Sequence, residues 1–172
     1  MSQIEYKKGD VIGNKYVVYD VLGKGGCGVV YRVFSKEPRG VCALKTFLDK
    51  YMADAQTRER FRKEAAIWIN LDKHPFIVNA YFVDEISGRL FIGMEYVEPA
   101  DSGWNTLEDY FKYQKIDFAQ GLRWAIQFCY GMEYAYSKGI KVHRDIKPSN
   151  IMVTFDKSIK ISDFGMAGFI DA

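Results

Sequence analysis

The stretch VHRDIKPSNIMVTFDKSIKISDFG, from Val142 to Gly165, carries the strongest structural signal in this chain. Two short apolar runs, Ile151–Thr154 and Ser158–Ser162, contain the β-branched residues that favour strands. Between them, Phe155–Lys157 interrupts the pattern in the manner of a turn. The stretch therefore predicts a tight β-hairpin, and the polar residues that flank its strands are candidates for a site.

The register expected for this hairpin brings two oxygen-bearing side chains together at its open end. We expect Thr154 to lie opposite Ile159, and this register places Asn150 opposite Asp163. An amide oxygen beside a carboxylate suits Mg²⁺, which takes one or two protein ligands and completes its shell with water and phosphate oxygens. The sequence thus predicts a metal–nucleotide site in which Asn150 and Asp163 bind the metal.

Two charged residues lie in the segment that leads into the hairpin. Asp145, five positions before Asn150, presents a carboxylate that can accept a proton from a substrate hydroxyl. Lys147 adds a point charge suited to a phosphoryl group in transfer. We expect both residues to be catalytic, together with Asn150.

The motif HRDIKPSN at 143–150, followed by DFG at 163–165, resembles the catalytic loop and the metal-binding loop of protein kinases. Either tripeptide can arise by chance, but the two together with Lys147 and Asn150 form a specific pattern. The lysine of this motif, Lys147, resembles the serine/threonine class of protein kinases rather than the tyrosine class. The resemblance implies an α+β, bilobal fold: a five-stranded antiparallel sheet with one main helix, then an incomplete, mainly helical second lobe. It also implies ATP and Mg²⁺, and a protein substrate with a serine or threonine hydroxyl.

A glycine-rich loop between two predicted strands, Tyr16–Leu22 and Val29–Phe34, is the candidate phosphate cover. It reads Gly23, Lys24, Gly25, Gly26, Cys27 and Gly28. Glycines let backbone amides approach phosphate oxygens closely. Dinucleotide-binding proteins share this spacing, but they continue into a helix, whereas the β-branched run after Gly28 favours a strand. A hairpin without a ligand stays an alternative. Cys27 is interpreted as a small tolerated residue, with a modifiable thiol as the alternative.

A lysine at the end of the predicted strand Val41–Lys45 has a candidate partner in the next helix. The apolar spacing of Arg58–Leu71 predicts that helix, and Glu64 lies on its apolar face. A carboxylate there is costly unless it is paired. Lys45 and Glu64 resemble the kinase pair that holds the α and β phosphates. As an alternative, Glu64 turns to solvent and meets Arg60 or Lys63.

Two further strands are predicted at Phe76–Val83 and Leu90–Val97. The resemblance implies that the connection after them binds the adenine edge, and that apolar residues enclose the ring. The residues concerned are Glu95 and Val97 in the connection, Met94 at the deeper pocket, and Val30, Ala43 and Met152 around the ring. The apolar members of this set fit an ordinary core equally well.

The segment PADSGWN at 99–105 breaks the strand pattern and predicts a boundary. We expect residues 1–98 to form the ATP-binding lobe and residues 99–172 to form part of the second lobe. The second part begins with a helix at Leu107–Tyr113 and continues with a longer helix that Asp117 caps and that extends to Ser137. The face of the longer helix expected to carry the hairpin consists of Leu122, Ala125, Ile126, Cys129 and Met132.

Composition limits the other classes of function. The chain has 172 residues, 48% of them hydrophobic, and a formal net charge of +2, so neither nucleic acid nor a membrane is an expected partner. No apolar run approaches the length of a membrane span, and no signal peptide is recognised at the start. An odd number of cysteines, three, indicates a reduced, cytoplasmic setting. With two histidines and no cysteine pair at metal spacing, zinc has no support.

The sequence ends at Ala172, seven residues after Gly165, where a complete kinase domain continues with an activation segment and further helices. We therefore expect an exposed apolar patch on the long helix, for a partner or for a further C-terminal segment. A kinase-like scaffold that binds nucleotide without turnover is the alternative function. A small-molecule kinase ranks third, because Lys147 and Pro148 count against it.

Overall fold

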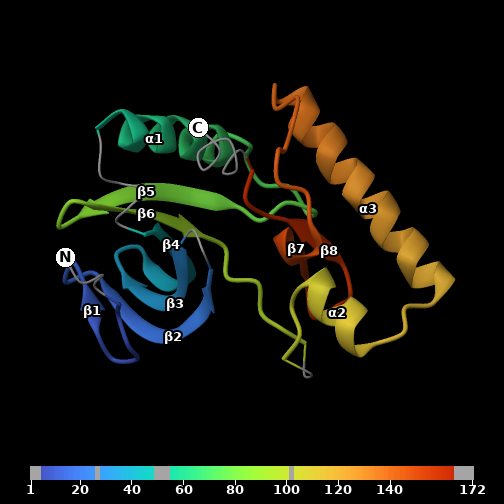
Figure 1. The fold of residues 1–172 in the computed structure, drawn as a ribbon, viewed down its shortest axis with the longest axis horizontal. Helices are drawn as coiled ribbons and strands as arrows, with labels where there is room; N and C mark the ends of the chain where they lie inside the picture. Colours follow the sequence, from blue (N-terminus) through green and yellow to red (C-terminus); the bar gives the residue numbers. More distant parts are fainter. Residues whose placement is uncertain (1–4, 26–27, 49–54, 101–102, 165–172) are drawn as a thin grey trace. The chain divides into compact units, whose positions relative to one another are not determined.

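The computed structural model describes residues 5–25, 28–48, 55–100 and 103–164 (Figure 1). The chain forms two compact units. The first contains the described residues up to Ala66 together with Ala80–Tyr96, and the second contains Ile67–Asn79 and the described residues from Val97 onward. Each unit carries part of the predicted site, so each is described by itself.

The first unit is built on a curled antiparallel sheet with strand order β1-β2-β3-β4-β6-β5 (Figure 1). The strands are β1 Val11–Ile12, β2 Tyr16–Lys24, β3 Gly28–Lys36, β4 Arg39–Phe47, β5 Ala80–Ile86 and β6 Arg89–Met94. The predicted antiparallel sheet is confirmed, and the structure adds β1 as a two-residue strand.

The predicted start of β5 at Phe76 was wrong. Phe76 O accepts from the Ile161 amide and the Val78 amide donates to Ile161 O, so this segment pairs with the hairpin of the second unit.

Alternation along β3 divides its side chains between two faces of the sheet. Val29, Tyr31, Val33 and Ser35 are buried, whereas the residues between them are partly exposed. This period of two is the pattern of a strand with one face on a core. The strand therefore presents Val30 on the face opposite the core, where the predicted nucleotide residues lie.

Helix α1, Ala55–Ile69, buries the apolar stripe that the sequence predicted. Phe61, Ala65 and Trp68 have at most 1% of their surface exposed. Phe61 packs edge-on against Phe47 of β4, with ring centroids 4.9 Å apart. The helix begins three residues before the predicted start at Arg58, but the predicted stripe is confirmed.

The second unit contains two helices and a short hairpin. The elements are α2 Leu107–Tyr113, α3 Phe118–Ser137, the 3-10 turn η2 Pro148–Asn150, β7 Ile151–Val153 and β8 Ile159–Ile161. Helix α2 has the predicted bounds and begins with a capping box between Thr106 and Asp109. Asp117 caps α3 as predicted, accepting from the Gln120 amide at 2.8 Å.

The predicted packing face of α3 was wrong. Leu122 and Ile126 are 49% and 47% exposed, and the helix instead buries Trp124, Gln127, Gly131 and Ala135. Gly131 lets the helix approach the hairpin, because a Cβ there would lie 2.8 Å from Cδ1 of Ile161.

Among the helices in the described ranges, none combines the length and hydropathy that a bilayer crossing requires.

Candidate active site

The hairpin of β7 and β8 forms as predicted, but its register differs by one residue from the prediction. Met152 lies opposite Lys160, and Val153 lies opposite Ile159. The turn decides this register: Thr154 and Ser158 pair through Thr154 N to Ser158 O at 2.9 Å, and Lys157 closes the loop with φ 63°. A residue in the left-handed region at the end of a three-residue loop is a common hairpin geometry.

Asn150 consequently lies opposite Ser162 rather than Asp163. The Ser162 amide and hydroxyl both donate to Asn150 O, at 2.9 and 3.0 Å. Asp163 follows directly, with φ 64°. A non-glycine residue in the left-handed region is strained, and such residues gather at functional sites. Arg144, next to Asp145 in the segment before the hairpin, has φ 72°. The backbone thus adopts the left-handed conformation both before and after the hairpin in sequence.

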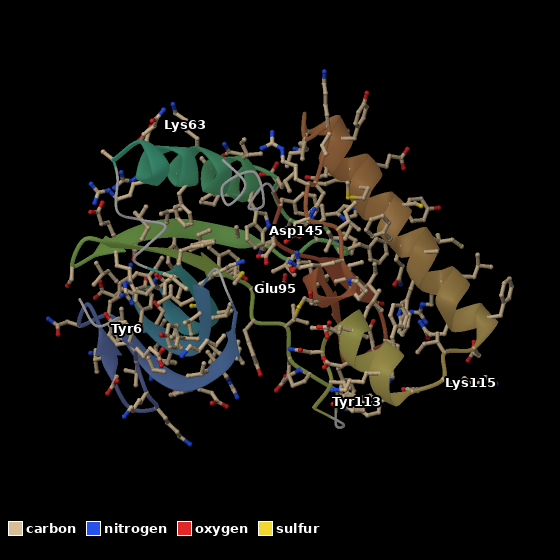
Figure 2. All side chains as sticks on the ribbon, viewed as in Figure 1. Tyr6, Lys63, Glu95, Tyr113, Lys115 and Asp145 are labelled. Carbon is tan, nitrogen blue, oxygen red and sulfur yellow. The ribbon has the colours of Figure 1, made fainter. Side chains whose placement is uncertain are left out.

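Asp145 is the centre of a hydrogen-bonded group beside the hairpin (Figure 2). Its Oδ2 accepts from Lys147 Nζ and from Asn150 Nδ2, each at 2.8 Å. Asn150 Nδ2 also donates to Asp145 O at 2.9 Å. Partial burial on its own would raise the pKa of Asp145, but the hydrogen bonds from Lys147 and Asn150 outweigh it and lower the pKa. The side chain is therefore a fixed carboxylate at neutral pH.

Asn150 and Asp163, the predicted metal ligands, both carry side-chain oxygen atoms. Asn150 donates both hydrogen bonds to Asp145 through its side-chain nitrogen Nδ2. The side-chain oxygen Oδ1 of Asn150 takes part in neither bond. Within the described residues, no group of three or more His, Cys, Asp or Glu side chains gathers as a metal site would. An amide oxygen and a carboxylate fit Mg²⁺, which keeps most of its shell for water and phosphate.

His143 anchors the segment that carries Asp145. It is 1% exposed, and its Nε2 lies 2.9 Å from Ser162 O. Because a carbonyl only accepts, Nε2 carries the proton, and Nδ1 is free to accept from the Asp145 amide at 3.3 Å. Burial lowers the pKa of His143, in keeping with this neutral form. The ring also packs on Phe164, with centroids 4.6 Å apart. These roles of His143 and Ser162 were not predicted from the sequence.

In the first unit, the glycine-rich loop joins β2 and β3. Gly23 pairs with Val30, and the Gly25 amide donates to Gly28 O at 2.9 Å. Gly28 has a steric role, because a Cβ there would lie 2.1 Å from Thr46 O on β4. Lys24 is exposed and pairs with Glu5. Gly26 and Cys27 lie outside the described residues.

The strands after this loop place three predicted nucleotide residues on one face. Val30 lies directly opposite Lys45, and Ala43 lies two residues before Lys45 on β4, so all three project from the same side. Ala43 also pairs with Met94 at the end of β6. Lys45 Nζ lies 5.3 Å from the centroid of the Phe47 ring. The predicted pairing of Lys45 with Glu64 involves a side chain outside the described residues and stays a prediction.

The connection after β6 begins at Glu95 (Figure 2). One contact here was not predicted from the sequence: the Arg32 guanidinium lies 4.8 Å from the centroid of the Tyr96 ring. The alternation of β3 could have indicated it, because Arg32 is two residues from Val30 and projects from the same face. Val97 is buried, with 6% exposed. In the second unit, Met152 is half-buried and forms a bridge to Thr106.

Comparison with known proteins relates the whole described fold to one family. The model of the protein kinase domain family matches residues 16–172. A probable serine/threonine-protein kinase of Clostridium acetobutylicum is 35% identical over 92% of this chain and 23% of its own length. Serine/threonine-protein kinase A of Synechocystis is 33% identical, over 94% of this chain and 33% of its own. The solved Mycobacterium tuberculosis PknI kinase domain has a TM-score of 0.77 and 27% identity, with 94% of this chain and 62% of that chain covered.

This chain belongs to the protein kinase domain family. It spans between 23% and 33% of the length of these curated relatives, and 62% of the PknI kinase domain. Members of the family generally use ATP with Mg²⁺ and act on protein substrates.

Proposed function

We propose that this chain is an ATP-dependent serine/threonine protein kinase domain, with a nucleotide-binding lobe at 1–98 and part of the catalytic lobe at 99–172. The observation that carries the proposal is the Asp145 carboxylate, held at 2.8 Å by both Lys147 and Asn150 beside the hairpin that ends at Asp163. Phosphoryl transfer requires positioning and electrostatic stabilisation more than covalent chemistry, and this group is suited to both.

Asp145 accepts a hydrogen bond from the serine or threonine hydroxyl of the protein substrate and orients its oxygen toward the γ-phosphorus. As the new O–P bond forms, the bond from the γ-phosphorus to the bridging oxygen breaks and ADP leaves with that electron pair. The hydroxyl proton passes to Asp145. Because hydrogen bonds lower the pKa of Asp145, the carboxylate stays ionised and available at neutral pH. Lys147, bonded to the same carboxylate, offsets charge on the phosphoryl group.

Asn150 and Asp163 would hold Mg²⁺, which neutralises charge on the phosphate oxygens when bound. Lys45, steadied by Glu64, would bind the α and β phosphates, and the loop from Gly23 to Gly28 would cover them. The common face of Val30, Ala43 and Lys45 supports this assignment. Met94, Glu95, Val97 and Met152 complete the proposed adenine site. The reduced thiols of Cys42 and Cys129 fit the cytoplasmic location that we propose.

The direct test is transfer of labelled phosphate from Mg-ATP to a generic basic protein. We expect Asp145→Asn to lower the rate by roughly 10²-fold or more, since it removes the proton acceptor. Asp117→Asn is the matched control, because asparagine also caps a helix and Asp117 lies outside the site. If the wild-type chain transfers no more label than the Asp145→Asn variant does, turnover by these 172 residues is refuted.

A nucleotide-binding scaffold without turnover is the second candidate. It is favoured by the exposed row of apolar side chains on α3, formed by Phe118, Leu122, Ile126 and Tyr130. A partner protein or a further C-terminal segment would cover this row. Thermal stabilisation by Mg-ATP that Asp163→Ala removes, in a chain that transfers no label, would support the scaffold over the kinase.

A further inference from the structure

One row of side chains crosses the sheet of the first unit on the face that carries the proposed adenine residues. Arg32 of β3 pairs with Ala43 of β4, and Ala43 pairs with Met94 of β6. Residues that pair directly across antiparallel strands project from the same face of the sheet. Arg32 therefore lies in line with two residues of the proposed adenine site.

The Arg32 side chain reaches across this row to the connection that follows β6. Its guanidinium lies 4.8 Å from the centroid of the Tyr96 ring, and Tyr96 comes two residues after Met94. Neighbouring strands are about 4.8 Å apart, so β3 and β6, which have β4 between them, are separated by roughly 10 Å. The contact therefore ties the connection to a strand two places away from β6, and both residues belong to the first unit.

Aromatic rings hold the Arg32 guanidinium. Asp20 pairs with Arg32 across β2 and β3, but its Oδ1 accepts from the Val21 amide at 2.8 Å. Among the described residues, the buried Nε atom of Arg32 has no hydrogen-bond partner. A second ring, that of Tyr19, has its centroid 5.9 Å from the guanidinium. Because a planar guanidinium stacks on aromatic faces, these ring contacts set the place of the side chain.

The proposed adenine site needs a connection that stays in place. Glu95, directly before Tyr96, is one of the residues proposed to bind the adenine edge. Backbone groups that bind a flat ring must keep a fixed distance from the side chains that enclose it, here Val30 and Ala43. Affinity falls when the ligand must order the loop that binds it. A side chain that fastens Tyr96 to β3 supplies this order before nucleotide binds.

We propose that Arg32 is a positioning residue for the adenine ring. It acts through Tyr96: the stack holds the connection after β6 against β3, so the backbone at Glu95 meets the adenine edge without further ordering. This inference rests on the proposed nucleotide site, and it assigns Arg32 to adenine binding rather than to phosphate transfer.

The Kd of Mg-ATP, measured by isothermal titration calorimetry, tests this role. Arg32→Met removes the guanidinium and should raise Kd roughly threefold to tenfold, the range expected for one cation–aromatic contact. Arg32→Lys should recover only part of this loss, because an ammonium does not stack as a guanidinium does. Tyr96→Phe keeps the ring and should bind as the wild type does. Arg39→Met is the matched control, since the Arg39 guanidinium lies 5.8 Å from the centroid of the Phe34 ring on the same sheet, and it should leave Kd unchanged.

A double-mutant cycle distinguishes positioning through Tyr96 from an independent effect of Arg32. The variant that combines Arg32→Met with Tyr96→Leu should have the Kd of Tyr96→Leu alone, whereas two independent contributions would multiply. Hydrogen exchange of the Glu95 and Tyr96 amides, measured without nucleotide, should be faster in Arg32→Met than in Arg39→Met.

The outcomes separate this inference from the proposed function. If the wild type binds Mg-ATP and Arg32→Met binds it equally well, the positioning role is overturned and the nucleotide site stands. An Arg32→Met effect that persists in full beside Tyr96→Leu, or amide exchange equal to that of Arg39→Met, would also overturn it. A wild-type chain that does not bind Mg-ATP would refute the proposed nucleotide site, and this inference with it.

Discussion

His143 shows how one buried side chain links the fold to pH. Desolvation disfavours its charged form, and this effect outweighs the Ser162 carbonyl and the charges of Asp163 and Asp145, which favour it. The neutral ring then bonds to Ser162 O and to the Asp145 amide. Protonation of Nδ1 would remove the hydrogen bond from the Asp145 amide, whereas Nε2 could still donate to Ser162 O.

We predict that the His143 imidazole titrates below 6.5, its ordinary value, in the folded chain. Above pH 6.5 the folded and unfolded chains both carry neutral histidine, so this residue adds no pH dependence there. As the pH is lowered below 6.5, the histidine of the unfolded chain is protonated first, so the free energy of unfolding decreases. The decrease ends once the pH is below the pKa of His143 in the folded chain. NMR titration of the ring protons measures this pKa directly. His74→Asn assigns the signals, since the chain has two histidines. A folded-state pKa above 6.5 would contradict the prediction.

Two strand glycines with different surroundings test the packing around the glycine-rich loop. We predict that Gly28→Ala lowers the free energy of unfolding by about 1–3 kcal/mol, because the new Cβ would lie 2.1 Å from the Thr46 carbonyl oxygen. Gly40→Ala is the matched control. Its Cβ meets open space, so stability should be unchanged or slightly higher. Urea unfolding measures both, and equal effects would show that the approach of β4 is not the cause.

At the scale of elements, helix α3 shows where an apolar pattern misleads. The sequence suggested that Leu122 and Ile126 face the hairpin, but the helix packs through Trp124 and Gln127 instead. Gln127 Oε1 accepts from the Ile159 amide at 3.0 Å, and Trp124 Nε1 donates to Lys157 O at 2.8 Å. The outer edge of a two-stranded hairpin exposes backbone groups that need polar partners. The packing face therefore includes a glutamine that apolar periodicity cannot identify.

We predict that Gln127→Met lowers the free energy of unfolding by about 1–3 kcal/mol, because it leaves the buried Ile159 amide without its acceptor. Ile126→Met is the control, one position away on the exposed side, and should change stability by less than about 0.5 kcal/mol. Chemical denaturation of the two variants separates these expectations. A larger loss for Ile126→Met would restore the face predicted from the sequence.

At the scale of the whole molecule, the proposed nucleotide site draws residues from both units. Lys45 belongs to the first unit, and Asp163 belongs to the second. We predict that Mg-ATP stabilises the chain by about 2.7 kcal/mol at a concentration of roughly 100 Kd, and that Lys45→Met and Asp163→Ala each remove most of this gain.

The control for this prediction is Lys36→Met, an exposed lysine that bonds to Asn14 O and has no assigned role. It should keep the full stabilisation by Mg-ATP. The measurement is Tm with and without nucleotide at several concentrations. Full stabilisation of Lys45→Met, together with its loss in Asp163→Ala, would restrict the nucleotide contacts to the second unit and contradict a shared site.

The sequence by itself determined the family, the antiparallel sheet, the helices α2 and α3 and the buried stripe of α1. These follow from motif spacing, from caps such as Asp117, and from periodicity, which are local properties of the chain. Tertiary structure decided the hairpin register, the packing face of α3, and the pairing of Phe76–Val78 with β8. Each depends on which backbone groups need partners after distant segments meet, and this requirement is not written in any one stretch of sequence.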